Sequence, residues 1–395
     1  MSVPRLRFPE FSEVWEEQRL ADICKINPNS GRLPEKFIYI DLESVENGVL
    51  LKENYINLSD APSRAQRLLN KDDILFQTVR PYQKNNFYFD KVDIRFQYVA
   101  STGYAQLRTY EDSKFLYQYL HTQKFVDSIL EKCTGTSYPA INSSDLSKII
   151  IYKPSLEEQQ KIGDFFMLLD KRIEQQEQKI ALLKDYKKAM MQKIFSQKIR
   201  FKDENGNDYP DWEEKKLGEM IYRSSKKNTD QKYDRIQSIS NKYGFVNQED
   251  YFQDRRVGSL NVSNYYVINK GCFAYNPSRI DVGSLAYKHD NDISIISPLY
   301  VSFKGNTKHI NDKFLLGWLF SHKFVGKLGR LFEGSVRNTL SYENLSTIDI
   351  ETPCIAEQEK IALFLEVIND SIENQKELLD EIIKEKTALL NRMFI

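Results

Sequence analysis

The sequence predicts an α+β protein in which two similar α/β domains are separated by two long antiparallel coiled-coil helices, arranged as a pseudo-two-fold tandem repeat. The first observation is that PSLEEQQKIGDFF (154–166) returns as PCIAEQEKIALFL (353–365), 199 residues later (353 − 154). The same offset pairs 114–196 with 313–395 without a gap. The second observation is a helical periodicity inside the repeat, and the third is a set of aromatic, strand-like runs before each copy. Such a repeat indicates two copies of one structural module.

The repeat also predicts the domain organisation, because each copy consists of a divergent front and a similar helix. We expect the fronts at 1–153 and 198–353, and the helices at 154–197 and 354–395. The fronts contain runs such as KFIYIDL and PLYVSFK, whose β-branched and aromatic residues favour short strands. We therefore expect each front to mix strands with helices.

The two ends of the chain are predicted to lie close together. The segment RLRF (5–8) resembles KIRF (198–201), which directly follows the first repeated helix, and no matching segment follows Ile395. We expect residues 5–8 to occupy, after the second helix, the place that 198–201 occupy after the first. Neighbouring chain ends are common in compact and symmetric proteins.

The repeated helices carry an apolar seam with steps of four and three residues, which is the pattern of a coiled coil. The seam residues that we expect to pack are Ile162, Phe166, Leu169, Ile173, Ile180 and Leu183 in the first helix and Ile361, Leu365, Ile368, Ile372, Leu379 and Ile382 in the second. Both seams also carry Gln and Lys at matching places: Gln176, Lys187, Gln375 and Lys386. These polar residues either set the register or lie at a loose edge. Each helix is expected to be roughly 60 Å long, at ~1.5 Å per residue.

The composition narrows the class of protein. Lys+Arg and Asp+Glu both number 56, so the formal net charge is zero and any nucleic-acid contact must come from local patches. The four cysteines are scattered, which argues against structural zinc and disulfides and fits a reducing cytoplasm. The chain shows no signal-peptide pattern and no run of about 18 apolar residues, so we expect a cytoplasmic protein without a membrane partner.

The sequence contains no recognisable catalytic or metal-binding motif. Neither a phosphate-binding G-x-x-x-x-G-K-[ST] loop nor a G-x-G-x-x-G turn is present. PDWEEK (210–215) is only faintly similar to a metal-nuclease signature, and a turn that enters a helix or strand is the better interpretation. YNPSR (275–279) lacks the second proline of the adenine-methyltransferase loop that it half resembles. We therefore expect a binding and scaffolding chain without catalytic residues, metal or a cofactor of its own.

The duplicated unit of a variable front and a P-x-x-x-E-Q-x-K-I-x-x-F helix resembles the specificity (S) subunit of type I restriction-modification systems. The resemblance spans the whole chain and includes TGTSYPAINSSDL (134–146) and its counterpart EGSVRNTLSYENL (333–345). The second copy departs from the first at Ser-Val-Arg-Asn in this loop and at Ala356, which replaces Glu157.

The resemblance implies a function as well as a fold. Each front would be a target-recognition domain that reads one half of a split double-stranded DNA sequence, and the helices would space the halves. The helices would also dock two modification (methyltransferase) subunits, which use S-adenosylmethionine to methylate adenine N6. Two restriction (motor nuclease) subunits, which use ATP and Mg, would complete the assembly. The chain itself would carry no catalysis.

Candidate DNA-binding residues are those that can donate to base edges and phosphates from turn-like segments. The candidates are Arg64, Arg67, Arg80, Tyr82, Gln83, Lys84, Thr136, Ser137 and Tyr138 in the first front and Lys226, Lys227, Arg255, Arg256, Asn276, Ser278, Arg279, Arg337 and Asn338 in the second. Arg80 and Arg279 follow similar strand-like runs and are favoured. For each residue the alternative is a surface salt bridge.

Two other classes of function stay open. A coiled-coil interaction protein with aromatic-rich heads that bind carbohydrate or protein would also explain the duplication and the helices. A single-chain nuclease or methyltransferase is disfavoured because its motifs are absent. The sequence does not name the target bases.

Overall fold

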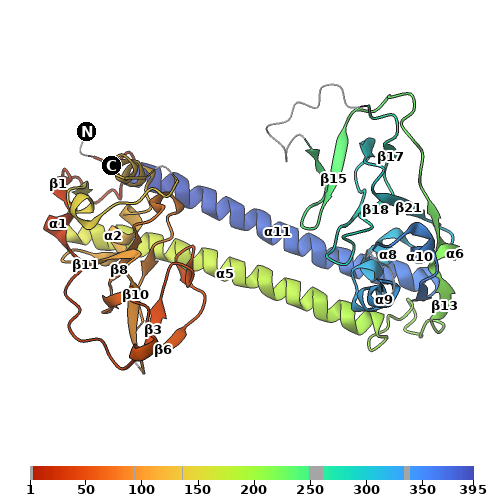
Figure 1. The fold of residues 1–395 in the computed structure, drawn as a ribbon, viewed down its shortest axis with the longest axis horizontal. Helices are drawn as coiled ribbons and strands as arrows, with labels where there is room; N and C mark the ends of the chain where they lie inside the picture. Colours follow the sequence, from red (N-terminus) through yellow and green to blue (C-terminus); the bar gives the residue numbers. More distant parts are fainter. Residues whose placement is uncertain (1–2, 92–94, 136, 249–260, 333–338) are drawn as a thin grey trace. The chain divides into compact units, whose positions relative to one another are not determined.

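The computed structural model describes residues 3–91, 95–135, 137–248, 261–332 and 339–395 (Figure 1). The chain forms two compact units. Unit 1 comprises Met1–Gln178 and Lys376–Ile395, and unit 2 comprises Lys179–Gln375. Each unit therefore contains one front, one half of the first long helix and one half of the second.

Unit 1 contains two four-stranded sheets, with strand orders β2-β11-β8-β9 and β6-β3-β10-β7. The strands of these sheets are β2 (Cys24–Ile26), β11 (Tyr104–Thr109), β8 (Ile74–Gln77), β9 (Phe87–Tyr88), β6 (Asn54–Asn57), β3 (Lys36–Ile40), β10 (Gln97–Ser101) and β7 (Ala65–Leu68). Two small sheets pair β1 (Glu16–Arg19) with β12 (Ile150–Lys153) and β4 (Val45–Glu46) with β5 (Val49–Leu50). Among the described strands of this unit, β3 and β10 run parallel and the other pairs run antiparallel.

Three of the short helices in unit 1 begin where the sequence offers a side chain to cap them. The helices are α1 (Leu20–Ile23), α2 (Ser113–Tyr119), α3 (Gln123–Leu130) and α4 (Ser143–Leu146), with single turns η1 (Leu58–Asp60) and η2 (Pro81–Gln83). Asp112, Thr122 and Asn142 accept hydrogen bonds from the backbone N–H of the third residue of α2, α3 and α4, respectively. Such caps satisfy donors that have no partner inside the helix.

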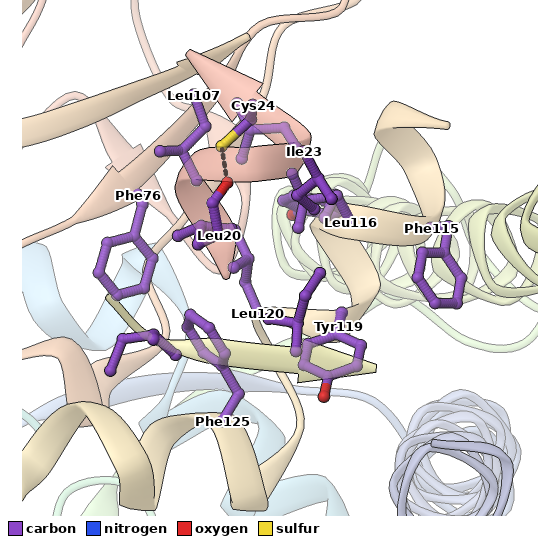
Figure 2. Close-up of a cluster of buried hydrophobic side chains, with 14 of the residues drawn as sticks. Leu20, Ile23, Cys24, Phe76, Leu107, Phe115, Leu116, Tyr119, Leu120 and Phe125 are labelled. Carbon is purple, nitrogen blue, oxygen red and sulfur yellow. Dashed lines mark hydrogen bonds between the residues drawn. The ribbon is translucent and has the colours of Figure 1, made fainter. Parts of the chain in front are cut away.

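The main core of unit 1 lies where α1, α2 and α3 pack on β8 and β11 (Figure 2). The labelled side chains are Leu20, Ile23, Cys24, Phe76, Leu107, Phe115, Leu116, Tyr119, Leu120 and Phe125, and all are buried. The Cys24 thiol donates to the Leu20 carbonyl oxygen at 3.2 Å, and burial raises the pKa of this thiol to about 12. Cys24 therefore acts as a small buried apolar residue.

Unit 2 repeats the strand connections of unit 1, with sheet orders β14-β21-β18-β19 and β16-β15-β20-β17. Its strands are β13 (Glu213–Lys216), β14 (Ile221–Arg223), β15 (Ile236–Ser240), β16 (Gly244–Asn247), β17 (Tyr266–Ile268), β18 (Cys272–Tyr275), β19 (Leu285–Tyr287), β20 (Ser294–Ile296), β21 (Val301–Gly305) and β22 (Asp349–Thr352). Its short helices are α6 (Leu217–Met220), α8 (Asp312–Leu319), α9 (His322–Phe332) and α10 (Tyr342–Ser346). The pair β15 and β20 is parallel, as β3 and β10 are in unit 1. The predicted repeat of an α/β module is confirmed.

The two repeated helices are α5 (Leu156–Phe195) and α11 (Ile355–Met393). Every predicted apolar seam position is buried or partly buried, and so are the polar positions Gln176, Lys187, Gln375 and Lys386. This burial confirms the coiled-coil periodicity, because positions between the seam residues are largely exposed.

Contacts within each unit show that the helices run antiparallel. In unit 1, Ile162 and Phe166 near the start of α5 share the core with Met393 near the end of α11. Lys386 also forms an ion pair with Asp170 across these two segments. In unit 2, residues near the end of α5 share the core with residues near the start of α11, namely Met191, Ile194, Phe195, Ile361, Ala362 and Leu365.

The N-terminal segment of unit 1 occupies the predicted place after α11. The Leu6 backbone N–H donates to the Arg392 carbonyl oxygen at 2.9 Å. Arg7 then forms a bidentate pair with Glu158, a fully buried carboxylate on α5, through Nε at 2.7 Å and Nη2 at 2.6 Å. The Phe8 ring packs edge-on against Phe165 at 5.9 Å.

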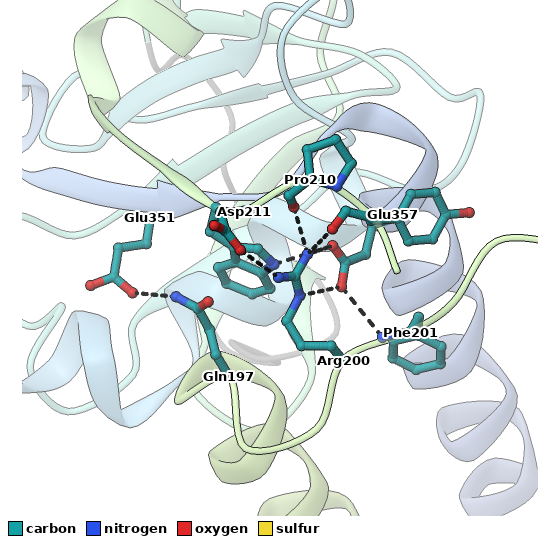
Figure 3. A network of polar contacts seen from close by, with 9 residues as sticks. Gln197, Arg200, Phe201, Pro210, Asp211, Glu351 and Glu357 are labelled. Carbon is teal, nitrogen blue, oxygen red and sulfur yellow. Dashed lines mark hydrogen bonds and ion pairs between the residues drawn. The ribbon is translucent and has the colours of Figure 1, made fainter. Parts of the chain in front are cut away.

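The matching place in unit 2 follows the end of α5 (Figure 3). Arg200 there holds the fully buried Glu357 of α11 through Nε at 3.1 Å and Nη2 at 2.8 Å. Arg200 also donates to the Pro210 carbonyl oxygen at 2.6 Å, and Trp212 donates to Glu357 at 3.2 Å. Residues 210–212 of the PDWEEK segment have no regular secondary structure and lead directly into β13, so the segment enters a strand, as expected.

Candidate nucleic-acid interface

Two loops of unit 1 that contain predicted site residues lie against each other. The first follows β8, and Arg80 in it has φ 55° and ψ 54°, which is the left-handed region. The Arg80 backbone N–H donates to the Pro139 carbonyl oxygen at 2.7 Å, and the Ile141 N–H donates to the Thr78 carbonyl oxygen at 3.0 Å. An antiparallel β-bridge between Val79 and Ala140 also joins the two loops. The structure therefore brings together two segments that the sequence analysis named as DNA-binding candidates without placing them side by side.

The side chains of these loops form a mixed aromatic and cationic surface. The Arg80 guanidinium lies 4.3 Å from the centroid of the Tyr138 ring, and Tyr138 is 63% exposed. Tyr82, in η2, is 47% exposed, and Ser137 is exposed beside Tyr138. Exposed rings and guanidinium groups are suited to stacking and hydrogen bonding with nucleic acid. Thr136 lies outside the described residues.

Two further candidates in the first loop are fixed by neighbouring elements. Gln83 accepts a hydrogen bond from the buried Gln77 at 3.0 Å. Lys84 donates to Gln123 at the start of α3 at 3.2 Å, and partial burial lowers the pKa of its ammonium group. The sequence analysis did not identify Gln77, which holds the Gln83 side chain in place. A polar residue at the end of the apolar run ILFQ (74–77) is a signal for such a supporting role.

Arg64 and Arg67 lie in or near β7 but in different environments. The Thr102 N–H donates to the Arg64 carbonyl oxygen at 2.9 Å, and Thr78 donates to Gly103 in the same turn, so the Arg64 backbone is tied to the Arg80 loop. The Arg64 side chain is exposed. Arg67 is partly buried, its Nε has no hydrogen-bond partner among the described residues, and burial lowers its pKa. Arg64 is thus the better placed of the two for an external ligand.

In unit 2 the Arg279 loop corresponds to the Arg80 loop, because the two arginines are 199 residues apart (279 − 80). The Leu340 N–H donates to the Pro277 carbonyl oxygen at 3.0 Å, which repeats the bond between Ile141 and Thr78. The Asn276 side chain accepts from the Ser278 N–H at 3.0 Å, so it stabilises its own turn. The Arg279 and Ser278 side chains are exposed.

The remaining candidates of unit 2 are not brought to this loop by any described contact. Lys226 and Lys227 are exposed beside β17, in the sheet that does not contain β18. Lys227 donates to Asn264 at 3.4 Å. Arg255, Arg256, Arg337 and Asn338 lie outside the described residues.

No group of three or more His, Cys, Asp or Glu side chains in the described part of the chain is arranged to hold a metal ion. None of the described helices combines the length and the apolar character needed to span a bilayer. The four cysteines are free thiols.

The fold and the paired loops define a duplicated binding protein, and comparison with known proteins identifies its class. The family model described as "Type I restriction modification DNA specificity domain" matches the chain twice, over residues 12–185 and 209–384. The chain belongs to this family. The predicted resemblance is therefore confirmed.

Relatives of this chain are named as specificity subunits of type I restriction enzymes. The chain is 28% identical over 171 residues to the type I restriction enzyme HindI specificity subunit of Haemophilus influenzae, a match that covers 40% of this chain and 36% of the relative. It is 26% identical to the putative MjaX specificity subunit of Methanocaldococcus jannaschii, over 64% of this chain and 60% of that relative. A match to the MjaVIII specificity subunit of the same organism is 24% identical and covers 98% and 92% of the two chains.

Solved structures show the same fold along the chain. The type I restriction-modification S subunit from M. genitalium has a TM-score of 0.60 at 15% identity, with 100% of this chain and 99% of that chain covered. A chain from a structure of a type I R-M system has a TM-score of 0.57 at 20% identity, with 96% and 97% covered.

Proposed function

We propose that this chain is the non-catalytic DNA specificity subunit of a type I restriction-modification complex, and that each unit reads one half of a bipartite DNA site. The observation that carries the proposal is the double family match on two units with the same strand connections. The Arg80 and Arg279 loops share one equivalent backbone hydrogen bond, from Ile141 to Thr78 in unit 1 and from Leu340 to Pro277 in unit 2. Divergent loops on a repeated frame are expected if the two units read different base sequences.

The long helices are proposed to determine the gap between the half-sites. They contain 40 and 39 residues, which corresponds to roughly 60 Å each at ~1.5 Å per residue. About 34 Å of B-DNA makes one helical turn. A spacer of this length makes the separation of the half-sites part of the specificity.

The partners are proposed to be double-stranded DNA, two modification subunits and two restriction subunits. Two equivalent docking positions are supported by Leu168 and Val367, which are 199 residues apart (367 − 168) on α5 and α11 and are 67% and 58% exposed. S-adenosylmethionine would bind to the modification subunits, and ATP with Mg to the restriction subunits. The complex would act in the cytoplasm, where the DNA is.

The proposal is tested by methylome sequencing of a strain that expresses this chain with its modification subunits. We expect adenine methylation at a split motif with a fixed gap, and no methylation at that motif when this chain is omitted. Methylation that persists without the chain, or a motif that is continuous rather than split, would contradict the proposal.

A further inference from the structure

Arg80 is held in place by both its backbone and its side chain. Its φ of 55° places it in the left-handed region, which is uncommon for a residue with a Cβ atom and persists only where neighbours hold it. Pro81 follows directly, although a residue before proline prefers an extended conformation. The hydrogen bond to Pro139 and the bridge between Val79 and Ala140 supply the constraint.

The guanidinium of Arg80 contacts an aromatic ring but forms no ion pair with a described residue. Its central carbon lies over the Tyr138 ring, 4.3 Å from the ring centroid, a cation–π contact that uses none of its N–H groups in a hydrogen bond. No described residue accepts a hydrogen bond from this side chain or forms an ion pair with it. Arg108 in the same unit differs, because its Nε and Nη2 both donate to the buried Asp73 carboxylate at 2.8 Å.

The shape of the available donors indicates the ligand. A planar fork of two N–H groups matches O6 and N7 of guanine in the major groove, a pairing that one ammonium group cannot reproduce. A phosphate contact needs only a donor and tolerates a flexible side chain. The fixed backbone of the Arg80 loop and the Tyr138 ring next to the guanidinium therefore favour the base over the phosphate.

We infer that Arg80 is a specificity-determining residue of unit 1 that binds the O6 and N7 edge of a guanine in its half-site, with Tyr138 as the positioning residue. The inference rests on the proposed function and adds one base and one contact to it.

The test measures DNA affinity of the full chain assembled with its modification subunits, on the split motif found by methylome sequencing. Each DNA duplex carries a base-pair substitution at one position of the unit 1 half-site. Further duplexes carry 7-deazaguanine, which lacks N7, in place of guanine. The wild-type assembly is expected to prefer guanine at one position by about 5- to 150-fold, the range for a bidentate arginine–guanine pair. 7-Deazaguanine at that position should lose a large part of this preference.

Variants separate the roles of the two residues. Arg80→Ala should abolish the preference at that position alone, and Arg80→Lys should keep more affinity but lose the preference as well. Tyr138→Ala should weaken the preference, and Tyr138→Phe should retain it because the ring stays. Arg64→Ala is the matched control, an exposed arginine in the same unit, and should weaken binding to all sequences equally.

Two results would overturn the inference while leaving the proposed function intact. One is an Arg80→Ala assembly that keeps full discrimination at every position. The other is an equal loss of DNA affinity on all sequences, together with a salt dependence of binding that is weaker by about one phosphate contact. That result would identify a contact to the DNA backbone. A wild-type assembly without any sequence preference would instead refute the proposed function, and the Arg80 assignment with it.

Discussion

Replacing Arg7 with alanine is expected to lower the free energy of unfolding of unit 1 by about 3–5 kcal/mol, because it leaves the buried Glu158 carboxylate without its counter-charge. Both donors that reach this carboxylate among the described residues belong to Arg7. The loss is measured by urea unfolding with Trp15 as the reporter in a Trp212→Phe/Trp318→Phe background, since Trp15 is buried in unit 1.

Arg200→Ala is the matched variant in unit 2, and its expected loss is smaller, about 1–3 kcal/mol. Glu357 keeps two donors there, the Trp212 indole N–H at 3.2 Å and the Phe201 backbone N–H at 3.3 Å. This variant is followed by Trp212 and Trp318, which both belong to unit 2, in a Trp15→Phe background. Equal losses for the two variants would show that the extra donors do not compensate. An unchanged unit 1 in Arg7→Ala would show that the ion pair does not hold the N-terminal segment.

Phe394→Ala is expected to destabilise unit 1 by about 3–5 kcal/mol, although the residue is next to the last position of the chain. Its side chain is 3% exposed. Its ring lies 5.3 Å from Phe115, 5.7 Å from Phe166 and 6.2 Å from Trp15, so it joins α11 to α2, to α5 and to the N-terminal segment. Removing the ring leaves a cavity between elements that are otherwise distant in sequence.

The measurement is the urea midpoint of unit 1, followed by Trp15 fluorescence as above. Phe195→Ala is the counterpart in unit 2, where Phe195 packs 5.7 Å from Phe314, and it should destabilise that unit instead. Leu182→Ala, at an exposed position on α5, should change neither midpoint by much. A Phe394→Ala protein with a wild-type midpoint would mean that the end of α11 does not belong to the core.

The sequence predicted the features that follow from long, regular patterns. The 199-residue offset predicted both modules, and the spacing from Ile162 and Ile361 predicted which helix positions are buried. The match of 5–8 to 198–201 predicted the place of Arg7. These features could be predicted because a coiled-coil period and a gap-free repeat extend over many residues, so that single exceptions do not hide them.

The sheets and the fine structure of the interface could not be predicted in this way. Strands of two to six residues carry little periodicity, and the parallel pair β3 and β10 joins segments that are far apart in sequence. The sequence also treated Arg64 and Arg67 alike, whereas the first side chain is exposed and the second is partly buried in β7. The contact between Arg80 and Tyr138 depends on two loops whose meeting is determined by tertiary structure.

The most direct test of the account is the exchange of residues 1–153 for the corresponding front of another specificity subunit, followed by methylome sequencing with the same modification subunits. If each unit reads its own half-site, the chimaera methylates a motif in which one half is replaced while the other half and the gap are retained. A motif in which both halves change, or neither does, would contradict the claim that the two units read DNA separately.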